Sequence, residues 1–171
     1  VGTNVAADAL SNLSSAGVIG GALIVVGEDY GAGASVIQER THAFALKSSL
    51  LLIDPRPTLP SLARMVEEAF GMSEASNLPT VISLRIRAAH MRGSMVCRDN
   101  VKPAIGMNAR LERHSFDYGR LSHPPSTYVQ EAQKFERRLP AARRYIVERG
   151  LNETIPGEDK SIGIILQGGV T

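Results

Sequence analysis

Two residues that follow a glycine-rich stretch are the first candidates for chemistry. Residues 27–35 carry three glycines and two acids after an apolar run, and Arg40 and His42 come shortly afterwards. A guanidinium can grip a planar carboxylate through two parallel hydrogen bonds, and an imidazole can donate a proton near neutral pH. Arg40 and His42 therefore suit the binding of a carboxylate substrate. An exposed helix face, with Arg40 paired to Glu39, explains the same residues without any ligand.

The glycine-rich stretch is itself a candidate binding loop. Ligands of open α/β sheets bind outside the carboxyl ends of the strands, and glycine lets the backbone approach a ligand closely. A dinucleotide fingerprint requires a third glycine at the position of Val36, so this pattern argues against a dinucleotide. A loop that merely connects two elements remains an equal alternative.

The first residues of the chain offer a further polar site. Asn4, close to Gly2, begins an expected helix, where its side chain can cap open N–H groups or face a polar ligand. Capping alone is the simpler interpretation. Elsewhere, His90 follows an expected strand, whereas His114 and His123 are too scattered to indicate a metal site.

These residues need elements to position them. Continuous apolar runs over 22–26 and 50–53 predict buried strands, residues 80–86 predict a third strand, and helical patterns cover 3–16, 36–48 and 60–76. The order β-α-β-α-β predicts an α/β fold, with a parallel sheet flanked by helices and right-handed crossovers.

The helix over 60–76 has a clear apolar stripe. Pro60 suits its first turn, and Pro79 prevents its continuation. We expect its buried face to consist of Leu62, Met65, Val66, Ala69 and Phe70, and its exposed face of Arg64, Glu67, Glu68 and Glu74. A fully buried Phe70 would cost roughly 3–5 kcal/mol on truncation to alanine.

The second half of the chain is less regular. Residues 88–125 lack periodicity and predict a long irregular connector that packs on its neighbours. Thr127 and Gln130 predict a capping box at the start of a helix, which Pro140 interrupts. Residues 160–167 predict a further strand.

Composition limits the class of protein. The chain has 171 residues, 43% of them hydrophobic, and its single cysteine, Cys97, excludes an internal disulfide. No apolar run approaches the roughly 20 residues of a membrane span, so we expect a cytoplasmic protein without a membrane partner. Residues 81–125 hold 8 Lys or Arg against 3 Asp or Glu. With few aromatic residues among them, we interpret this segment as a surface that faces another domain or subunit, and not nucleic acid.

Four segments in order resemble the alpha subunit of indolepyruvate:ferredoxin oxidoreductase, within the thiamine diphosphate-dependent 2-oxoacid:ferredoxin oxidoreductases. Residues 1–10 are similar to a segment of the form VGxNVAADxL, and residues 20–29 to a strand and loop of the form GGxxxVVxxD. Residues 69–74 and 85–93 continue the resemblance, which extends more loosely over 128–152. Together these segments are specific to that family.

The resemblance implies oxidative decarboxylation of aryl 2-oxoacids to acyl-CoA, with electrons leaving through iron–sulfur clusters to ferredoxin. It implies thiamine diphosphate with Mg²⁺, bound between a pyrimidine-binding and a pyrophosphate-binding domain. Gly2 and Asn4 match a segment near the pyrimidine and are the expected cofactor-binding residues. Arg40 resembles an arginine that meets the substrate carboxylate in related pyruvate enzymes, and Arg40 and His42 are the expected substrate-binding residues. No catalytic or metal-ligating residue is assigned.

The resemblance also implies a domain organisation. Residues 1–93 are expected to form a partial pyrimidine-binding α/β domain with the thiamine diphosphate-binding fold, and residues 94–126 an irregular inter-domain connector. Residues 127–171 are expected to form a helical linker and the first strand of a second α/β domain. The glutamate that activates the cofactor and the metal-binding domain are expected outside this sequence, so we expect a fragment that is inactive alone.

The expected partners are the remaining domains of the parent chain, a partner subunit, ferredoxin and coenzyme A, in an oligomer. Two alternatives stay open. A strand followed by a glycine-rich loop also suits a nucleotide-binding α/β protein of another class, and the basic connector suits a non-catalytic interaction module.

Overall fold

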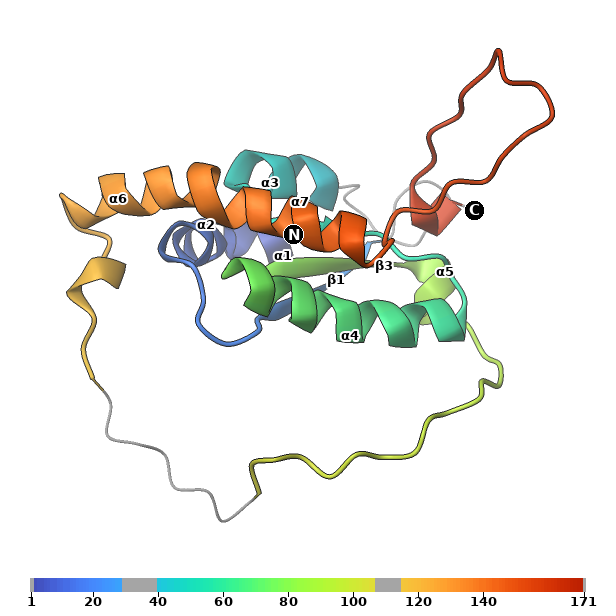
Figure 1. The fold of residues 1–171 in the computed structure, drawn as a ribbon, viewed down its shortest axis with the longest axis horizontal. Helices are drawn as coiled ribbons and strands as arrows, with labels where there is room; N and C mark the ends of the chain where they lie inside the picture. Colours follow the sequence, from blue (N-terminus) through green and yellow to red (C-terminus); the bar gives the residue numbers. More distant parts are fainter. Residues whose placement is uncertain (1, 29–39, 107–114, 171) are drawn as a thin grey trace.

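The computed structural model describes residues 2–28, 40–106 and 115–170 (Figure 1). The loop predicted at residues 29–35, the first residues of the helix predicted over 36–48, and His114 lie outside the described residues. The described elements, in chain order, are α1 (Gly2–Val5), α2 (Ala7–Ala16), β1 (Leu23–Glu28), α3 (Thr41–Ser48), β2 (Leu51–Ile53), α4 (Leu59–Ser76), β3 (Thr80–Arg85), α5 (Ile86–Ala89), the 3₁₀ turn η1 (Tyr118–Arg120), α6 (Ser126–Gln133), the π-helical η2 (Lys134–Arg138), α7 (Leu139–Glu148) and the 3₁₀ turn η3 (Gly168–Val170).

A parallel sheet of strands β1, β3 and β2, in that order, forms the centre of the fold. Leu23 of β1 and Leu51 of β2 both pair with Thr80 of β3, so all three strands begin at one level and point the same way. The prediction of an α/β fold with a parallel sheet flanked by helices is confirmed, and this partial architecture is consistent with a thiamine diphosphate-binding type of fold.

The prediction that the strand over 22–26 is buried on both faces is wrong. Among the described residues, β1 pairs only with β3, and Val25 is 59% exposed. The helix α4 leaves this outer part of the sheet partly uncovered, and an apolar hollow of about 250 Å³ remains there between Val25, Val66 and Leu84. An apolar run without alternation therefore identified a strand but not its place at the sheet edge.

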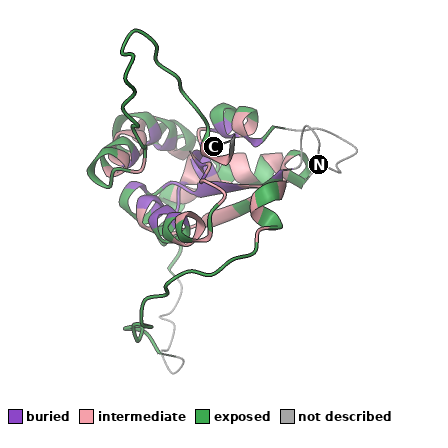
Figure 2. Cartoon of the chain, turned by 90° about the vertical axis from the view of Figure 1, so that its right-hand side faces the viewer, coloured by how far each residue is buried: buried purple, intermediate pink, exposed green. Residues whose placement is uncertain are grey.

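Helices cover both faces of the sheet. On one face the core consists of Leu51, Ile53, Met65, Ala69, Met72, Leu78, Ile82 and Ala142. These residues belong to the sheet and to α4 and α7, apart from Leu78 just before β3. On the other face, Val81 packs with Ala45 of α3 and with Leu10 of α2. Figure 2 shows the buried residues gathered in the sheet and on the helix faces that meet it.

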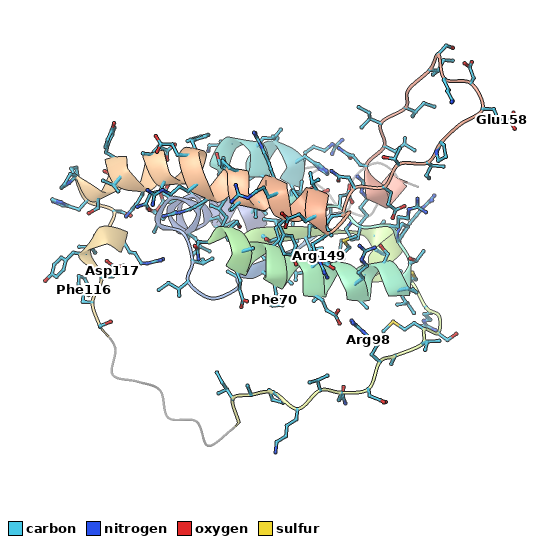
Figure 3. The ribbon with its side chains drawn as sticks, in the orientation of Figure 1. Phe70, Arg98, Phe116, Asp117, Arg149 and Glu158 are labelled. Carbon is cyan, nitrogen blue, oxygen red and sulfur yellow. The ribbon has the colours of Figure 1, made fainter. Side chains whose placement is uncertain are left out.

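The helix α4 begins and ends as predicted, and Met65 and Ala69 of its predicted face are buried, but Val66 and Phe70 are exposed. Pro60 lies in its first turn, and Asn77 ends it in the left-handed conformation (φ 55°). Phe70 is 44% exposed, whereas Glu68 is buried. The predicted stripe took only the sheet into account, yet α4 also packs against α7, which draws Glu68 inside and leaves Phe70 outside (Figure 3).

The segment from α6 through η2 to α7 is one long rod across the molecule (Figure 1). Pro140 was expected to interrupt it, but the π-helical turns of η2 just before it carry the helix past the missing N–H. The predicted capping box is wrong. Gln130 is buried, and its Nε2 donates to the carbonyls of Gly119 (2.8 Å) and Leu121 (3.0 Å) instead of reaching back to the helix start.

Two arginines, one in η1 and one in η2, form hydrogen bonds with the end of α2. Arg138 donates from Nη1 to the Ser15 carbonyl (2.9 Å), and Arg120 donates from Nη1 to the Gly17 carbonyl (3.2 Å). Cations favour the negative end of a helix dipole. Gly17 has a φ of +74°, and a Cβ there would overlap Arg138, so glycine is required at this crossing.

The predicted strand over 160–167 does not form. Residues 151–167 contain no helix or strand, and Ile164 and Ile165 are 78% and 100% exposed. A strand needs a neighbouring strand for its backbone hydrogen bonds, and no described residue supplies one. Residues 92–106 lie largely exposed in an extended path, although Met95 lines the apolar hollow and Arg98 pairs with Glu67, so the expectation that the connector packs on its neighbours stays a prediction. The division into domains stays a prediction.

Candidate functional site

Three charged residues lie where the parallel strands end, and two of them, Asp54 and Arg85, form an ion pair. Glu28 is the last residue of β1, Asp54 directly follows β2, and Arg85 is the last residue of β3. Because the strands are parallel, these residues lie at the same end of the sheet, beyond the carboxyl ends of the strands. Open α/β sheets bind their ligands at that end. Figure 2 views the molecule from this side, with the C-terminus near the strand ends.

Glu28 holds the start of α3. Its carboxylate is buried, accepts a hydrogen bond from the Thr41 backbone N–H, and accepts another from the Ser83 hydroxyl (3.3 Å). The first N–H groups of a helix have no partner within the helix, and a negative charge there interacts favourably with the helix dipole. Glu28 thus fixes the backbone between Arg40 and His42.

Asp54 contacts three separate segments. Its Oδ2 accepts a hydrogen bond from Arg85 Nη2 (2.7 Å) and lies 3.5 Å from His42 Nε2. Its Oδ1 accepts from the Gly169 backbone N–H (3.1 Å). The side chains of Asp54, Arg85 and His42 are 9%, 11% and 24% exposed, so the charged pair is largely shielded while the imidazole is partly open to solvent.

Residues 167–169 close one side of this cluster. Arg85 Nη2 also donates to the Gln167 side-chain oxygen (2.7 Å). At Gly168 a Cβ would overlap the Asp54 carbonyl oxygen, and at Gly169 it would overlap the Arg85 side chain. The backbone approaches the strand ends so closely that only glycine fits at these two positions.

The predicted site residues fall in two groups. His42 lies in the cluster, and Arg40 is exposed at the N-cap of α3, two residues before it. Gly2 and Asn4 lie in α1, where both are exposed. Among these four residues, His42 contacts Asp54 of the cluster, and Arg40 precedes His42 by two residues in the chain.

The other candidates from the sequence lie at the end of α5 and in the irregular segments that follow it. His90, just after α5, and Cys97 are exposed. The His123 ring lies 2.6 Å from the Pro124 carbonyl, through Nδ1. Among the described residues, no three His, Cys, Asp or Glu side chains gather closely enough to hold a metal ion. Within the same residues, no helix has the length and apolarity needed to cross a membrane.

A second buried charge cluster joins α4 to α7 and serves packing. Glu68 accepts hydrogen bonds from Arg149 and from the Tyr145 hydroxyl. The Arg149 guanidinium lowers the pKa of Glu68, although burial opposes the shift. Burial raises the pKa of Tyr145, and its hydrogen bond to Glu68 adds to that rise. This cluster lies between two helices and not at the strand ends.

The strand-end cluster can bind an anion and orient a proton donor. Arg85 pairs with Asp54, while the exposed Arg40 and, when protonated, His42 supply positive charge at the start of α3. A planar carboxylate suits this pair. Glu28, Asp54 and Arg85 were missed in the sequence, although each lies within two residues of the end of an expected strand, a position that could have been examined for every strand.

Curated proteins similar to the chain share one name. The IorA subunit of indolepyruvate oxidoreductase from Methanothermobacter thermautotrophicus is 26% identical over 173 residues, which cover 99% of this chain and 26% of that protein. Its counterpart from Pyrococcus horikoshii is 26% identical over 75% of this chain and 19% of its own length. The one from Pyrococcus abyssi is 32% identical over 56% of this chain and 15% of its own length.

The chain is IorA-like, and the resemblance predicted from the ordered motifs is confirmed. It spans about a quarter or less of the length of these relatives. No protein-family model matches the chain, and no solved structure matches it significantly.

Proposed function

We propose that this IorA-like chain is part of a thiamine diphosphate-dependent 2-oxoacid:ferredoxin oxidoreductase of the indolepyruvate type. The observation that carries the proposal is the match to an indolepyruvate oxidoreductase subunit along 99% of the chain. The parallel sheet, with charged side chains gathered at its carboxyl edge, supports a ligand-binding role for this part of the protein.

The substrate in this proposal is an aryl 2-oxoacid. Arg40 binds its carboxylate through paired hydrogen bonds, and His42 donates a hydrogen bond to one of its oxygens. Glu28 supports both residues, because its buried carboxylate fixes the Thr41 backbone between them. The chain's own contribution is therefore to bind and orient the substrate, and not to break a bond.

The cofactor in this proposal is thiamine diphosphate, which supplies the electron sink for decarboxylation when bound. Gly2 and Asn4 fit a contact with its pyrimidine. No heavy atom lies within 4 Å of the place of a Cβ on Gly2, and the exposed Asn4 amide can both donate and accept a hydrogen bond. Among the described residues, no three His, Cys, Asp or Glu side chains gather closely enough to hold the accompanying Mg²⁺.

The partners in this proposal are the remaining parts of the parent protein, a second subunit, ferredoxin with its iron–sulfur clusters, and coenzyme A as the acyl acceptor. The relatives are named as subunits, which supports a multi-subunit assembly. The exposed apolar residues of segment 162–166 and the exposed cations of segment 87–102 are surfaces on which such neighbours can pack.

Acceptor reduction by the whole protein tests this function. The protein that contains this chain is purified anaerobically with its partner subunit and supplied with thiamine diphosphate, Mg²⁺ and coenzyme A. We expect it to reduce ferredoxin or a viologen dye with indolepyruvate and phenylpyruvate faster than with pyruvate or 2-oxoglutarate. Omission of coenzyme A or of thiamine diphosphate is the control and should abolish turnover. Absence of reduction with every 2-oxoacid would contradict the proposal.

A further inference from the structure

One carboxylate at the strand ends contacts three segments that are distant in sequence. Asp54 binds Arg85 of β3 at 2.7 Å and the Gly169 N–H at 3.1 Å, and it lies 3.5 Å from His42 of α3. Its side chain is only 9% exposed, so it is poorly placed to meet a substrate itself. Its position instead allows it to act on the neighbours that are more open to solvent.

The backbone around Asp54 restricts where its carboxylate can point. Pro55 follows directly, and a residue before proline is confined to extended conformations. Behind it, Gly168 and Gly169 pack so closely on Asp54 and Arg85 that neither tolerates a Cβ. A carboxylate offers acceptor sites on both oxygens, and here Oδ1 is taken by the Gly169 N–H while Oδ2 faces Arg85 and His42.

The contact with His42 determines which ring nitrogen is available. Nε2 faces the carboxylate, so Nδ1 is the nitrogen left for a substrate oxygen, to which it donates when the imidazole is protonated. At 3.5 Å this contact is longer than a typical hydrogen bond, and it becomes an ion pair that restrains the ring when the imidazole is protonated. Arg85, held by the same oxygen at 2.7 Å, prevents the carboxylate from following the imidazole.

We propose that Asp54 is a positioning residue, which holds the His42 imidazole in the orientation that meets the 2-oxoacid carboxylate. The inference rests on the proposed function for the role of His42 toward substrate. Residues 167–169 are part of the same arrangement, because the Gly169 N–H and the Gln167 side chain fix Asp54 and Arg85 from the opposite side.

A double-mutant cycle in the assembled protein is the kinetic test. His42→Gln, Asp54→Asn and the double variant are compared with the wild type for the KM and kcat of indolepyruvate. We expect each single substitution to raise KM roughly two- to tenfold, the range of coupling between contacting residues, with kcat changed less. The double variant should be no worse than His42→Gln alone, because Asp54 acts through His42. Effects that multiply, or a His42→Gln variant with unchanged KM, would overturn the proposal.

Chemical labelling of His42 gives a second readout that needs no turnover. The rate at which diethylpyrocarbonate modifies His42, followed by peptide mass spectrometry, should rise several-fold in Asp54→Asn, while the exposed His90 serves as the internal reference. Asp54→Glu keeps the charge, so His42 should be labelled as slowly as in the wild type. This variant can still be measured if Asp54→Asn does not fold. Asp99→Asn, at an exposed position, is the matched control and should behave like the wild type.

The two readouts separate this inference from the proposed function. A wild-type protein that turns over no 2-oxoacid would contradict the function, yet faster labelling of His42 in Asp54→Asn would still support the hold of Asp54 on the ring. An unchanged labelling rate in Asp54→Asn would overturn that hold, whatever the activity of the wild type.

Discussion

Glu68 of α4 and Arg149 at the end of α7 are joined by two hydrogen bonds, from Nε to Oε2 at 3.0 Å and from Nη2 to Oε1 at 2.7 Å. The Tyr145 hydroxyl donates a third hydrogen bond to Oε2 at 2.9 Å. The carboxylate is buried, whereas the arginine side chain is 57% exposed. This pair links the long C-terminal rod to the helix that covers the sheet (Figure 3).

Glu68→Gln should destabilise the protein by about 1–3 kcal/mol, because charge-assisted hydrogen bonds in a buried position are lost. The free energy of unfolding in urea measures the change. The matched control is Glu67→Gln, one residue earlier on the same helix, where the side chain is 62% exposed and pairs with Arg98. That change should stay within about 0.5 kcal/mol. Equal effects of the two substitutions would contradict the buried role of Glu68.

The same pair should make stability depend on pH. The pKa of Glu68 is lowered below its ordinary value of 4.5, chiefly by the hydrogen bond from Arg149. The carboxylate therefore stabilises the fold above pH 4.5, and this contribution disappears as the pH falls through the lowered pKa. We expect the difference in stability between the wild type and Glu68→Gln to shrink as the pH falls from 7 toward 3. If the stability difference between the wild type and Glu68→Gln grew on acidification, Glu68 would not stabilise the fold as a carboxylate.

Gly71 of α4 should not tolerate alanine, although alanine normally stabilises a helix by roughly 1 kcal/mol over glycine. A Cβ at Gly71 would overlap the Tyr145 hydroxyl, which is itself held by Glu68. We expect Gly71→Ala to destabilise the protein by about 1–3 kcal/mol, as overpacking does. Adding Tyr145→Phe removes the overlapping atom and should recover part of that loss in thermal unfolding. Gly106→Ala, where nothing lies near a Cβ, is the control and should have little effect.

Truncation to alanine should destabilise the protein more on the buried face of α4 than on its exposed face. Met72 is 1% exposed and Phe70 is 44% exposed. Met72→Ala should therefore cost about 2–5 kcal/mol, and Phe70→Ala clearly less, because much of the ring stays in water in the folded protein. Chemical denaturation of both variants measures this order. If Phe70→Ala lost more stability than Met72→Ala, Phe70 would belong to the buried face of α4, as its periodicity predicted.

The sequence was sufficient for the sheet but not for what surrounds it. Apolar runs identified all three strands, because strand formation depends on local composition. The buried face of α4 could not be predicted, since it depends on α7, whose Arg149 lies 81 residues beyond Glu68 and is its partner. The segment over 160–167 has the composition of a strand, yet a strand also needs a neighbour, which no described residue provides.

The site was predictable only in part for the same reason. Arg40 and His42 were found because they lie a few residues after a strand and loop. Asp54 and Arg85 meet 31 residues apart, and Gly169 joins them from 115 residues beyond Asp54. Only the parallel arrangement of the strands, together with the return of the chain, brings these groups to one edge.

The Michaelis constant of the Arg40→Ala variant for indolepyruvate tests the central claim most directly, that the start of α3 binds a 2-oxoacid carboxylate. Loss of a charge-assisted pair of hydrogen bonds should raise KM roughly tenfold or more in the assembled protein. Arg40→Lys keeps the charge but not the planar guanidinium, so its KM should lie between those of Arg40→Ala and the wild type. A KM that is unchanged in Arg40→Ala, with normal turnover, would contradict the account.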